Sequence, residues 1–141
     1  MSIRKLEPSD YNKNYLNLLK QLSDCPDLSP SEFELIYNQL DINHNIYIIE
    51  HDNKIIASIT LIREPKFIHG KAVLHIEDVI VDENSRNLGY GKQLLEFALQ
   101  YAKDTDCYKT ILNCNPIYKD FYEKFGFKCK NIEMAHYIFE I

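Results

Sequence analysis

Two adjacent carboxylates, Glu77 and Asp78, interrupt a strongly aliphatic segment of the chain. A buried, ionised carboxylate without a partner is unfavourable, so such a group is paired, protonated or used in chemistry. A low dielectric and a like-charged neighbour both raise the pKa of a carboxyl group toward neutrality, which suits a general base beside a substrate amine. The alternative is a structural role, in which a carboxylate forms an ion pair or holds a loop through backbone hydrogen bonds. Alternation along a strand sends the two side chains to opposite faces of a sheet unless a β-bulge redirects one of them.

The segment Arg86–Lys92 follows this strand and holds two of the four glycines of the chain. Glycine lets the backbone approach a ligand closely, and the N–H groups and dipole at a helix start attract phosphate. Arg86 could add a charge-assisted contact to a pyrophosphate. The alternative is an ordinary strand-to-helix turn with a solvated arginine, and the third glycine of the dinucleotide-binding fingerprint is absent.

Aromatic residues gather around the end of a short helix in the segment Phe121–Phe127. Core packing with a glycine at the helix end explains such a cluster, whereas the hydroxyl of Tyr122 could act as a general acid. A fourth segment, Glu64–Gly70, lies between two predicted strands and carries Lys66 and His69. It is either a solvated turn or an anion-binding loop.

Hydrophobic periodicity predicts the elements that must position these residues. The expected helices are a first one capped by Ser9 and Asp10 that includes Tyr15 and Leu22, a second one begun by the capping box Ser29-Pro30-Ser31-Glu32, a third over Tyr90–Ala102 and a short one over Tyr118–Phe125. The expected strands are Ile46–Glu50 and Ile55–Arg63, which form a hairpin, then a central strand Ala72–Asp82, a short strand Tyr108–Cys114 and a last extended stretch Phe127–Ile141.

The composition is typical of one globular domain that spans residues 1–141, with 45% hydrophobic and 26% charged residues. Sixteen basic and 21 acidic residues give a formal net charge of −5, which argues against nucleic acid or an anionic membrane as a partner. No segment approaches the roughly 20 apolar residues of a membrane span. The first ten residues do not resemble a signal peptide, so we expect a soluble, cytoplasmic protein.

The four cysteines and five histidines show no spacing typical of a metal site, so no metal is expected. In a chain without a secretion signal, reduced cysteines are the expectation. Cys114 and Cys129 have no evident base beside them in the sequence, so we expect them to be core cysteines rather than acyl carriers.

The order and spacing of these segments resemble the GNAT superfamily of N-acetyltransferases, in which a strand precedes an Arg/Gln-x-x-Gly-x-Gly/Ala loop. The matching residues are Arg86, Gly89 and Gly91, followed by an amphipathic helix and, later, by Tyr122. The resemblance implies the α/β (α+β) GNAT fold, a central mixed, mostly antiparallel twisted sheet flanked by helices. It also implies acetyl-coenzyme A (acetyl-CoA) as co-substrate.

Within the superfamily, the chain resembles the eukaryotic-type glucosamine 6-phosphate N-acetyltransferase family over almost its whole length. The segments that carry this resemblance are Lys66–His69, His75–Val79, Cys107–Lys109, Leu112–Cys114 and Phe121–Phe127. The resemblance implies direct transfer, in a ternary complex, of acetyl from acetyl-CoA to the 2-amino group of glucosamine 6-phosphate, a step toward UDP-N-acetylglucosamine. It also implies a homodimer whose sugar sites lie near the subunit interface.

The resemblance implies a set of site residues as well. Glu77, Asp78 and Tyr122 match the catalytic group, and we expect Glu77 to accept the amine proton and Tyr122 to protonate the sulfur. A backbone N–H near Val79 is expected to stabilise the developing oxyanion. Cofactor contacts are implied for Val79, Ile80, Val81, Arg86, Asn87, Leu88, Gly89, Tyr90, Gly91, Lys92 and Tyr122. Acceptor contacts are implied for Ser23, Lys66, Phe67, Ile68, His69, Glu77, Asp78, Tyr108, Lys109 and Asn113.

Three positions depart from the family pattern. Asn113 stands where the family has an acid that steers the amine, and Tyr118 stands where an asparagine contacts coenzyme A. His136 and Tyr137 stand near the position of an arginine that helps to bind the sugar phosphate. These departures keep two alternatives open. One is an acetyltransferase for another small amine, such as an unphosphorylated amino sugar, a polyamine or an amino acid, and the other is a catalytically silent module that binds acetyl-CoA.

Overall fold

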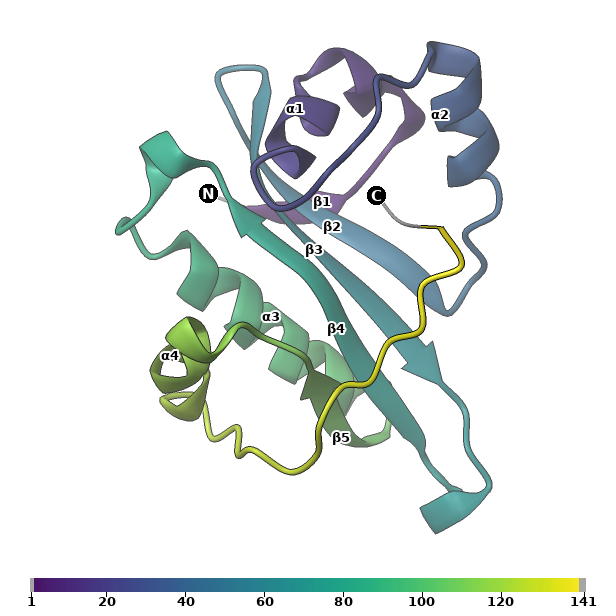
Figure 1. Ribbon diagram of the computed structural model, residues 1–141, viewed down its shortest axis with the longest axis vertical. Coiled ribbons are helices and arrows are strands. Elements are labelled where there is room, and N and C mark those ends of the chain that lie inside the picture. Colours follow the sequence, from purple (N-terminus) through teal and green to yellow (C-terminus); the bar gives the residue numbers. More distant parts are fainter. Residues whose placement is uncertain (1, 140–141) are drawn as a thin grey trace.

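A single five-stranded β-sheet organises the computed structural model, which describes residues 2–139 (Figure 1). The strands lie side by side in the order β1 (Ile3–Lys5), β2 (His44–His51), β3 (Lys54–Glu64), β4 (Ala72–Val81) and β5 (Cys107–Leu112). Neighbouring strands from β1 to β4 are antiparallel, whereas β5 runs parallel to β4. The predicted mixed, mostly antiparallel sheet is therefore confirmed.

Helices cover both faces of this sheet. They are α1 (Tyr15–Leu19) and α2 (Pro30–Tyr37) on one face, and α3 (Tyr90–Asp104) and α4 (Lys119–Glu123) on the other. Consecutive residues of β2 separate the two layers, because Ile48 packs with α1 and α2 while Ile49 packs with α3. These sides are referred to below as the α1/α2 face and the α3/α4 face. β3 is buried from Ile55 to Leu61 because both layers pack on it.

The capping box predicted for the second helix is present in α2. Ser29 Oγ accepts a hydrogen bond from Glu32 N (3.2 Å), and Glu32 Oε1 accepts one from Ser29 N (3.0 Å). Pro30 occupies the first helical position, where its missing N–H is not needed. Because all these contacts are local, the start of this helix can be predicted from the sequence.

The prediction that Ser9 and Asp10 cap the first helix is wrong. Pro8–Asn12 form a 3₁₀ turn, and α1 begins only at Tyr15. Asp10 is completely buried, and its carboxylate accepts hydrogen bonds from the guanidinium group of Arg4 in β1. A buried charge needs close partners, so this ion pair determines the position of Asp10.

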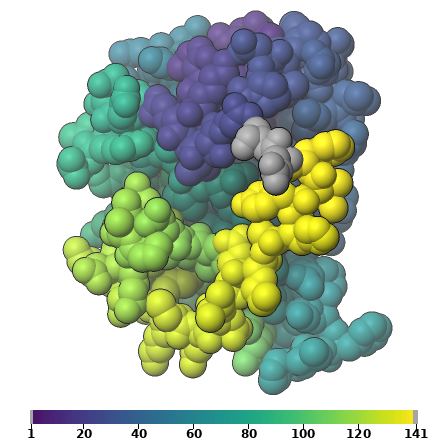
Figure 2. All heavy atoms as spheres, viewed as in Figure 1, coloured from purple at the N-terminus to yellow at the C-terminus, as the bar shows by residue number. Residues whose placement is uncertain are grey.

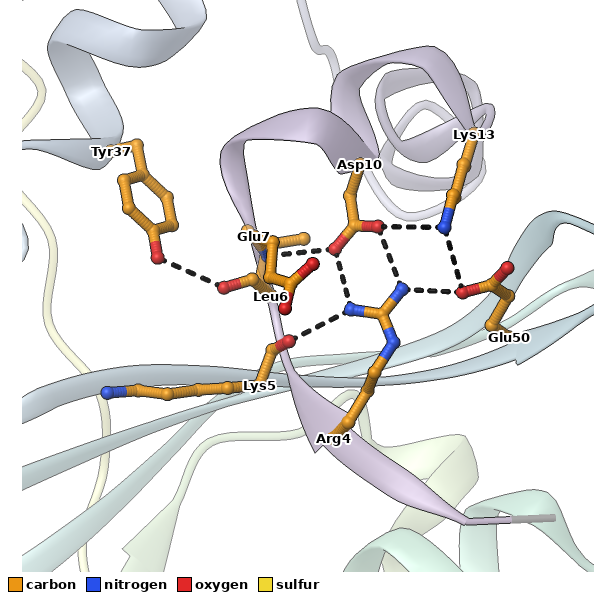
Figure 3. A network of polar contacts seen from close by, with 8 residues as sticks. All are labelled: Arg4, Lys5, Leu6, Glu7, Asp10, Lys13, Tyr37 and Glu50. Carbon is orange, nitrogen blue, oxygen red and sulfur yellow. Dashed lines mark hydrogen bonds and ion pairs between the residues drawn. The ribbon is translucent and has the colours of Figure 1, made fainter.

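A network of four charged side chains ties β1 to the turn before α1 and to the end of β2 (Figure 3). Arg4 donates to the two carboxylate oxygens of Asp10 (2.8 and 2.9 Å) and to Glu50 Oε1 (2.6 Å). Lys13 Nζ lies 3.2 Å from Glu50 Oε1 and 3.8 Å from Asp10 Oδ1. Burial by itself would raise the pKa of Asp10, but the hydrogen bonds from Arg4 and from Glu7 N hold this pKa below its usual value. The network therefore anchors a strand of only three residues.

The end of the chain differs from prediction in two respects. The expected extended stretch Phe127–Ile141 forms no strand over residues 127–139, and residues 140–141 lie outside the described part. Cys114 and Cys129, expected in the core, are both exposed. The first lies in the connection before α4, and the second lies in the exposed segment after it.

None of the described helices is long and apolar enough to cross a membrane. Within residues 2–139, no group of three or more His, Cys, Asp or Glu side chains is arranged to hold a metal ion. All four cysteines are free thiols.

Candidate active site

A β-bulge in β4 carries the two adjacent acids, Glu77 and Asp78. The register between β3 and β4 shifts by one residue between Ser58 and Thr60, so that one residue of β3 opposes Asp78 and Val79 together. Asp78 has a left-handed backbone conformation with φ of +49°. Regular alternation along β4 is therefore interrupted at Asp78, by a β-bulge of the kind that can redirect one of the two acids.

Glu77 lies on the α1/α2 face, and the charge of Asp78 acts on a residue of the same layer. Glu77 is paired with Thr60 and therefore shares its face. Thr60 lies on the same face as Ser58, whose Oγ is 3.2 Å from the hydroxyl oxygen of Tyr15 in α1. Burial raises the pKa of Tyr15 to about 12, and the charge of Asp78 contributes to this rise. The charge of Asp78 therefore acts on a side chain of the α1/α2 layer.

Glu77 has the properties of a general base. Burial raises the pKa of its carboxyl group, the charges of Asp78 and Glu133 raise it further, and His75 opposes them. A carboxylate with a raised pKa accepts a proton efficiently near neutral pH. Glu133 belongs to the segment after α4, which lies beside the α1 and α2 layer on the same side of the molecule (Figure 2). Sequence reasoning missed Glu133 because no local pattern links it to β4.

The pairing of β4 with β5 ends just before the acids. The last registered pair is Ile76 with Leu112, so residues 77–81 of β4 have no partner in β5. An unpaired strand edge offers backbone N–H and C=O groups to a second extended chain. Val79 and Val81 pack on the α3/α4 face. A linear ligand along this edge would therefore reach from the α3/α4 face to Glu77 on the α1/α2 face.

Tyr122 lies in α4, on the α3/α4 face. Its ring makes edge contacts with Phe121 (centroids 5.2 Å apart) and Phe127 (6.0 Å apart), which confirms the core-packing interpretation of this aromatic segment. Burial raises the pKa of its hydroxyl group, and the side chains of Cys114 and Tyr118 add to the rise. The hydroxyl group therefore keeps its proton at neutral pH, as a general acid must.

The loop between β4 and α3 has the features of an anion-binding site. α3 begins after Gly89, whose φ of +88° lies in the left-handed region that favours glycine, and its first turn contains no acidic residue. Arg86 Nε donates a hydrogen bond to Val81 O (3.1 Å), which holds the guanidinium group beside the loop. A Cβ atom on Gly91 would lie 3.4 Å from Phe121, so α4 packs against the start of α3. The predicted cofactor residues thus come together at one end of β4.

Three of the predicted acceptor residues, Glu77, Asp78 and Asn113, lie at the bulge or just after the neighbouring strand β5, and a fourth, Ser23, lies in the segment after α1. Asn113 directly follows Leu112, which is the last residue of β5 and the partner of Ile76, so it lies just beyond the end of the β4–β5 pairing. Ser23 lies in the segment after α1, two residues beyond Gln21, whose side chain contacts the β4–α3 loop. In Figure 1 this segment lies near the carboxyl end of β4.

The other six predicted acceptor residues lie toward the opposite end of β4 and form a distal cluster: Lys66, Phe67, Ile68, His69, Tyr108 and Lys109. His69 stacks on Tyr108 with ring centroids 4.3 Å apart, and Lys109 Nζ lies 5.7 Å from the centre of the Tyr108 ring. Lys109 of this cluster is paired with Val73 near the start of β4. Glu77 is four residues farther along the strand, which corresponds to roughly 13 Å. Within one copy of the chain, the distal cluster is therefore separate from the acids.

Comparisons with known proteins show the family to which this chain belongs. The family model described as the acetyltransferase (GNAT) family matches residues 10–127. The probable glucosamine 6-phosphate N-acetyltransferase 2 of Oryza sativa subsp. japonica is 39% identical over 97% of this chain and 87% of its own length. The glucosamine 6-phosphate N-acetyltransferase of Arabidopsis thaliana is 39% identical over 96% of this chain and 95% of its own. A crystal structure of glucosamine-6-phosphate N-acetyltransferase from Arabidopsis thaliana superposes with a TM-score of 0.92 at 37% identity and covers 97% of both chains. The chain therefore belongs to the acetyltransferase (GNAT) family.

Proposed function

We propose that this chain is an acetyl-CoA-dependent N-acetyltransferase that acetylates the 2-amino group of glucosamine 6-phosphate. The observation that carries the proposal is Glu77, a partly buried carboxyl group with a raised pKa, placed by a β-bulge where the pairing of β4 and β5 has ended. The choice of acceptor is supported by the similar proteins from Oryza sativa and Arabidopsis thaliana, which bear the name of this activity and match almost the whole chain.

The β4–α3 loop fits the pyrophosphate group of acetyl-CoA. The start of α3 carries the positive end of the helix dipole and has no acid in its first turn. We assign the pyrophosphate to residues 86–92, with Arg86 as the cationic partner, and the pantetheine chain to the backbone of residues 79–81 on the unpaired edge of β4. Acetyl-CoA supplies the acetyl group as an activated thioester, and the protein supplies the proton transfers.

Direct transfer in a ternary complex is the proposed route. Partial desolvation by neighbouring atoms and the charge of Cys129 raise the pKa of the Cys114 thiol, which keeps this exposed cysteine protonated and a poor nucleophile at neutral pH. Glu77 accepts the proton of the substrate ammonium group, either directly or through a water molecule. Asp78 and Asn113 flank the same position and orient the amine.

Two further groups stabilise the charges that develop during transfer. A backbone N–H at the bulge, near Val79, donates to the carbonyl oxygen as negative charge accumulates there. Tyr122, on the α3/α4 face, donates its proton to the departing sulfur. The second proton that the nitrogen loses as the amide forms passes to solvent, from which the Tyr122 phenolate is protonated again. Amine and sulfur are thus served from opposite faces of the sheet.

Replacing Glu77 by glutamine is expected to lower kcat by about 10²-fold or more and to flatten the acid limb of the kcat profile, since glutamine cannot accept the proton. In the wild type this limb lies above the usual pH range of a glutamate, because the pKa of Glu77 is raised. The profile is measured between pH 4 and pH 9 with both substrates saturating, a range chosen to span roughly the ordinary pKa values of glutamate and cysteine.

Glu133→Gln is the matched control for this assignment. Removal of the Glu133 charge lowers the pKa of Glu77, so the acid limb should move to lower pH while turnover at neutral pH is retained. An acid limb that is the same in the wild type and in Glu77→Gln would contradict the assignment of Glu77 as the base.

We assign the distal cluster to the acceptor site of a second copy of the chain. It is separate from Glu77 within one copy, and Phe67 and Ile68 in the same cluster are exposed to solvent. In a two-fold symmetric dimer, each copy can present its distal cluster to the bulge of the other. The cationic groups of Lys66 and Lys109 then serve the sugar phosphate, while Glu77 and Asp78 of the first copy serve the amine.

Mixing two inactive variants tests this composite site. Glu77→Gln and Lys109→Ala are each expected to have low activity at limiting glucosamine 6-phosphate. Coexpression should restore about a quarter of the wild-type activity, because half of randomly formed dimers are mixed and each mixed dimer has one intact site. If the coexpressed mixture has only the average activity of the two variants expressed alone, the composite site is contradicted. Lys109 and Glu77 would then belong to the same copy's site or to no common site.

The function itself is tested by mass-spectrometric detection of acetylated product from acetyl-CoA. The acceptors are glucosamine 6-phosphate, glucosamine and a panel of polyamines and amino acids. Product that depends on the 6-phosphate supports the proposal. The neutral Asn113, just beyond the end of the β4–β5 pairing, favours the second candidate, a GNAT enzyme for another amine, which predicts product only from the panel. Coenzyme A binding without any product would indicate a non-catalytic module.

A further inference from the structure

Gln21 joins the segment after α1 to the loop that precedes α3. Its side-chain Nε2 donates to Asp82 Oδ1 (2.8 Å), and its Oε1 accepts from Glu83 N (2.9 Å). An ionised carboxylate only accepts hydrogen bonds and a backbone N–H only donates them, so the two partners fix the orientation of the amide. The residues lie 61 and 62 positions apart in the chain, and no local sequence pattern connects them.

Asp82 is held in place by burial and by backbone hydrogen bonds. It is 7% exposed, its backbone N donates to Ile56 O (2.7 Å), and its backbone O accepts from Ser85 N (2.8 Å). A 3₁₀ turn, Glu83–Ser85, follows directly and leads into Arg86. Gln21 therefore holds the two residues from which the proposed pyrophosphate-binding loop starts.

We propose that Gln21 is a positioning residue for coenzyme A binding and acts through Asp82 and Glu83. This inference rests on the proposed function, because it concerns the loop to which that function assigns the pyrophosphate. A loop that is already ordered loses less conformational entropy when a ligand binds, so affinity depends on the contacts that hold the free loop in place. Gln21 has no contact with the proton-transfer groups among its hydrogen bonds, so its removal should act on binding and leave turnover at saturation unchanged.

The test compares four variants in the full-length protein: Gln21→Ala, Gln21→Glu, Asp82→Asn and the double variant Gln21→Glu/Asp82→Asn. Gln21→Ala removes both hydrogen bonds, and Gln21→Glu places one carboxylate against another. Asp82→Asn keeps an acceptor for the Gln21 amide. In the double variant, the new asparagine amide can donate to the new carboxylate, which can also accept from Glu83 N, so both hydrogen bonds return with donor and acceptor exchanged.

Two measurements report the effect, the Kd of coenzyme A by calorimetric titration and the split between KM and kcat for acetyl-CoA. Gln21→Ala and Gln21→Glu are expected to raise both Kd and KM about tenfold, the effect of losing one charge-assisted and one neutral hydrogen bond. At saturating acetyl-CoA, kcat should stay within about twofold of the wild type. The double variant should bind coenzyme A within about threefold of the wild type.

Gln100→Ala is the matched control, since it removes a glutamine that bonds Asp104 on the exposed side of α3 (2.9 Å) and should leave Kd unchanged. A Gln21→Ala variant with wild-type Kd overturns the inference, and so does a loss of affinity that the double variant does not recover. If the wild type binds no coenzyme A, the proposed function fails and the inference fails with it. If the wild type binds and acetylates, but Gln21→Ala does so equally well, only the inference fails.

Discussion

Replacing Tyr122 by phenylalanine is expected to lower kcat by roughly 10²-fold or more, with little change in the affinity for acetyl-CoA. The substitution removes the hydroxyl group and keeps the ring, so the edge contacts with Phe121 and Phe127 remain. Burial raises the pKa of this hydroxyl group, which is therefore protonated and able to serve the departing thiolate at neutral pH. Steady-state turnover and calorimetric titration with coenzyme A measure the two effects separately.

Tyr118→Phe is the control for this prediction. Tyr118 lies directly before α4 and is exposed, so loss of its hydroxyl should leave kcat within about twofold of the wild type. Unchanged turnover in Tyr122→Phe removes the role of general acid. An equal loss in both variants would assign the effect to the packing of α4 rather than to proton donation.

Replacing Arg4 by methionine is expected to lower the free energy of unfolding by about 3 kcal/mol, since it leaves the fully buried carboxylate of Asp10 without its main partner. The value is at the low end for a broken buried pair, because Arg4 is partly exposed and Lys13 Nζ still lies 3.8 Å from Asp10 Oδ1. Urea unfolding at pH 7 measures the change. Lys92→Met, which breaks an exposed pair with Glu96, is the control and should cost less than about 0.5 kcal/mol.

The same pair of proteins gives a pH test. The pKa of Asp10 in the folded wild type lies below its usual value, so its stabilising contribution is present above about pH 4 and is lost as the pH falls through the folded-state pKa. Without Arg4, burial raises the pKa of Asp10, and protonation relieves the buried charge. The stability difference between the wild type and Arg4→Met should therefore shrink at acidic pH, and an equal difference at pH 7 and at low pH would contradict the prediction.

The elements predicted well are those whose signals are local. The expected strand Ala72–Asp82 corresponds to β4, Ala72–Val81, and the expected helix Tyr90–Ala102 corresponds to α3, Tyr90–Asp104. The apolar pattern of β4 is long because this strand is buried against both layers, and that of α3 repeats along the one face that packs on the sheet. β1, Ile3–Lys5, was not predicted because three residues carry no periodicity, and its position depends on pairing with β2 and on the Arg4 network.

The candidate site could be predicted only in part, for the same physical reason. Glu77, Asp78 and Tyr122 could be named as candidates from the sequence. The bulge beside the two acids depends on the register with β3, and the face of Tyr122 depends on the packing of α4. The contact between Gln21 and Asp82 joins segments that are distant in the chain, so it becomes visible only in three dimensions. Likewise, the family resemblance assigns the distal cluster and the two acids to one acceptor site, but within one copy of the chain they lie apart.

The proposed acceptor groups and the proposed coenzyme groups lie on opposite faces of the sheet, and this arrangement affects the order in which the products can leave. In the proposed reaction, the acids serve the acceptor on the α1/α2 face, whereas Tyr122 and the valines that pack beneath α3 border the coenzyme on the other face. If the proposed reaction holds, the two products leave from opposite faces of the sheet, and neither has to leave before the other. Product inhibition should consequently follow a random-release pattern, in which each product competes only with the substrate that enters from its own side.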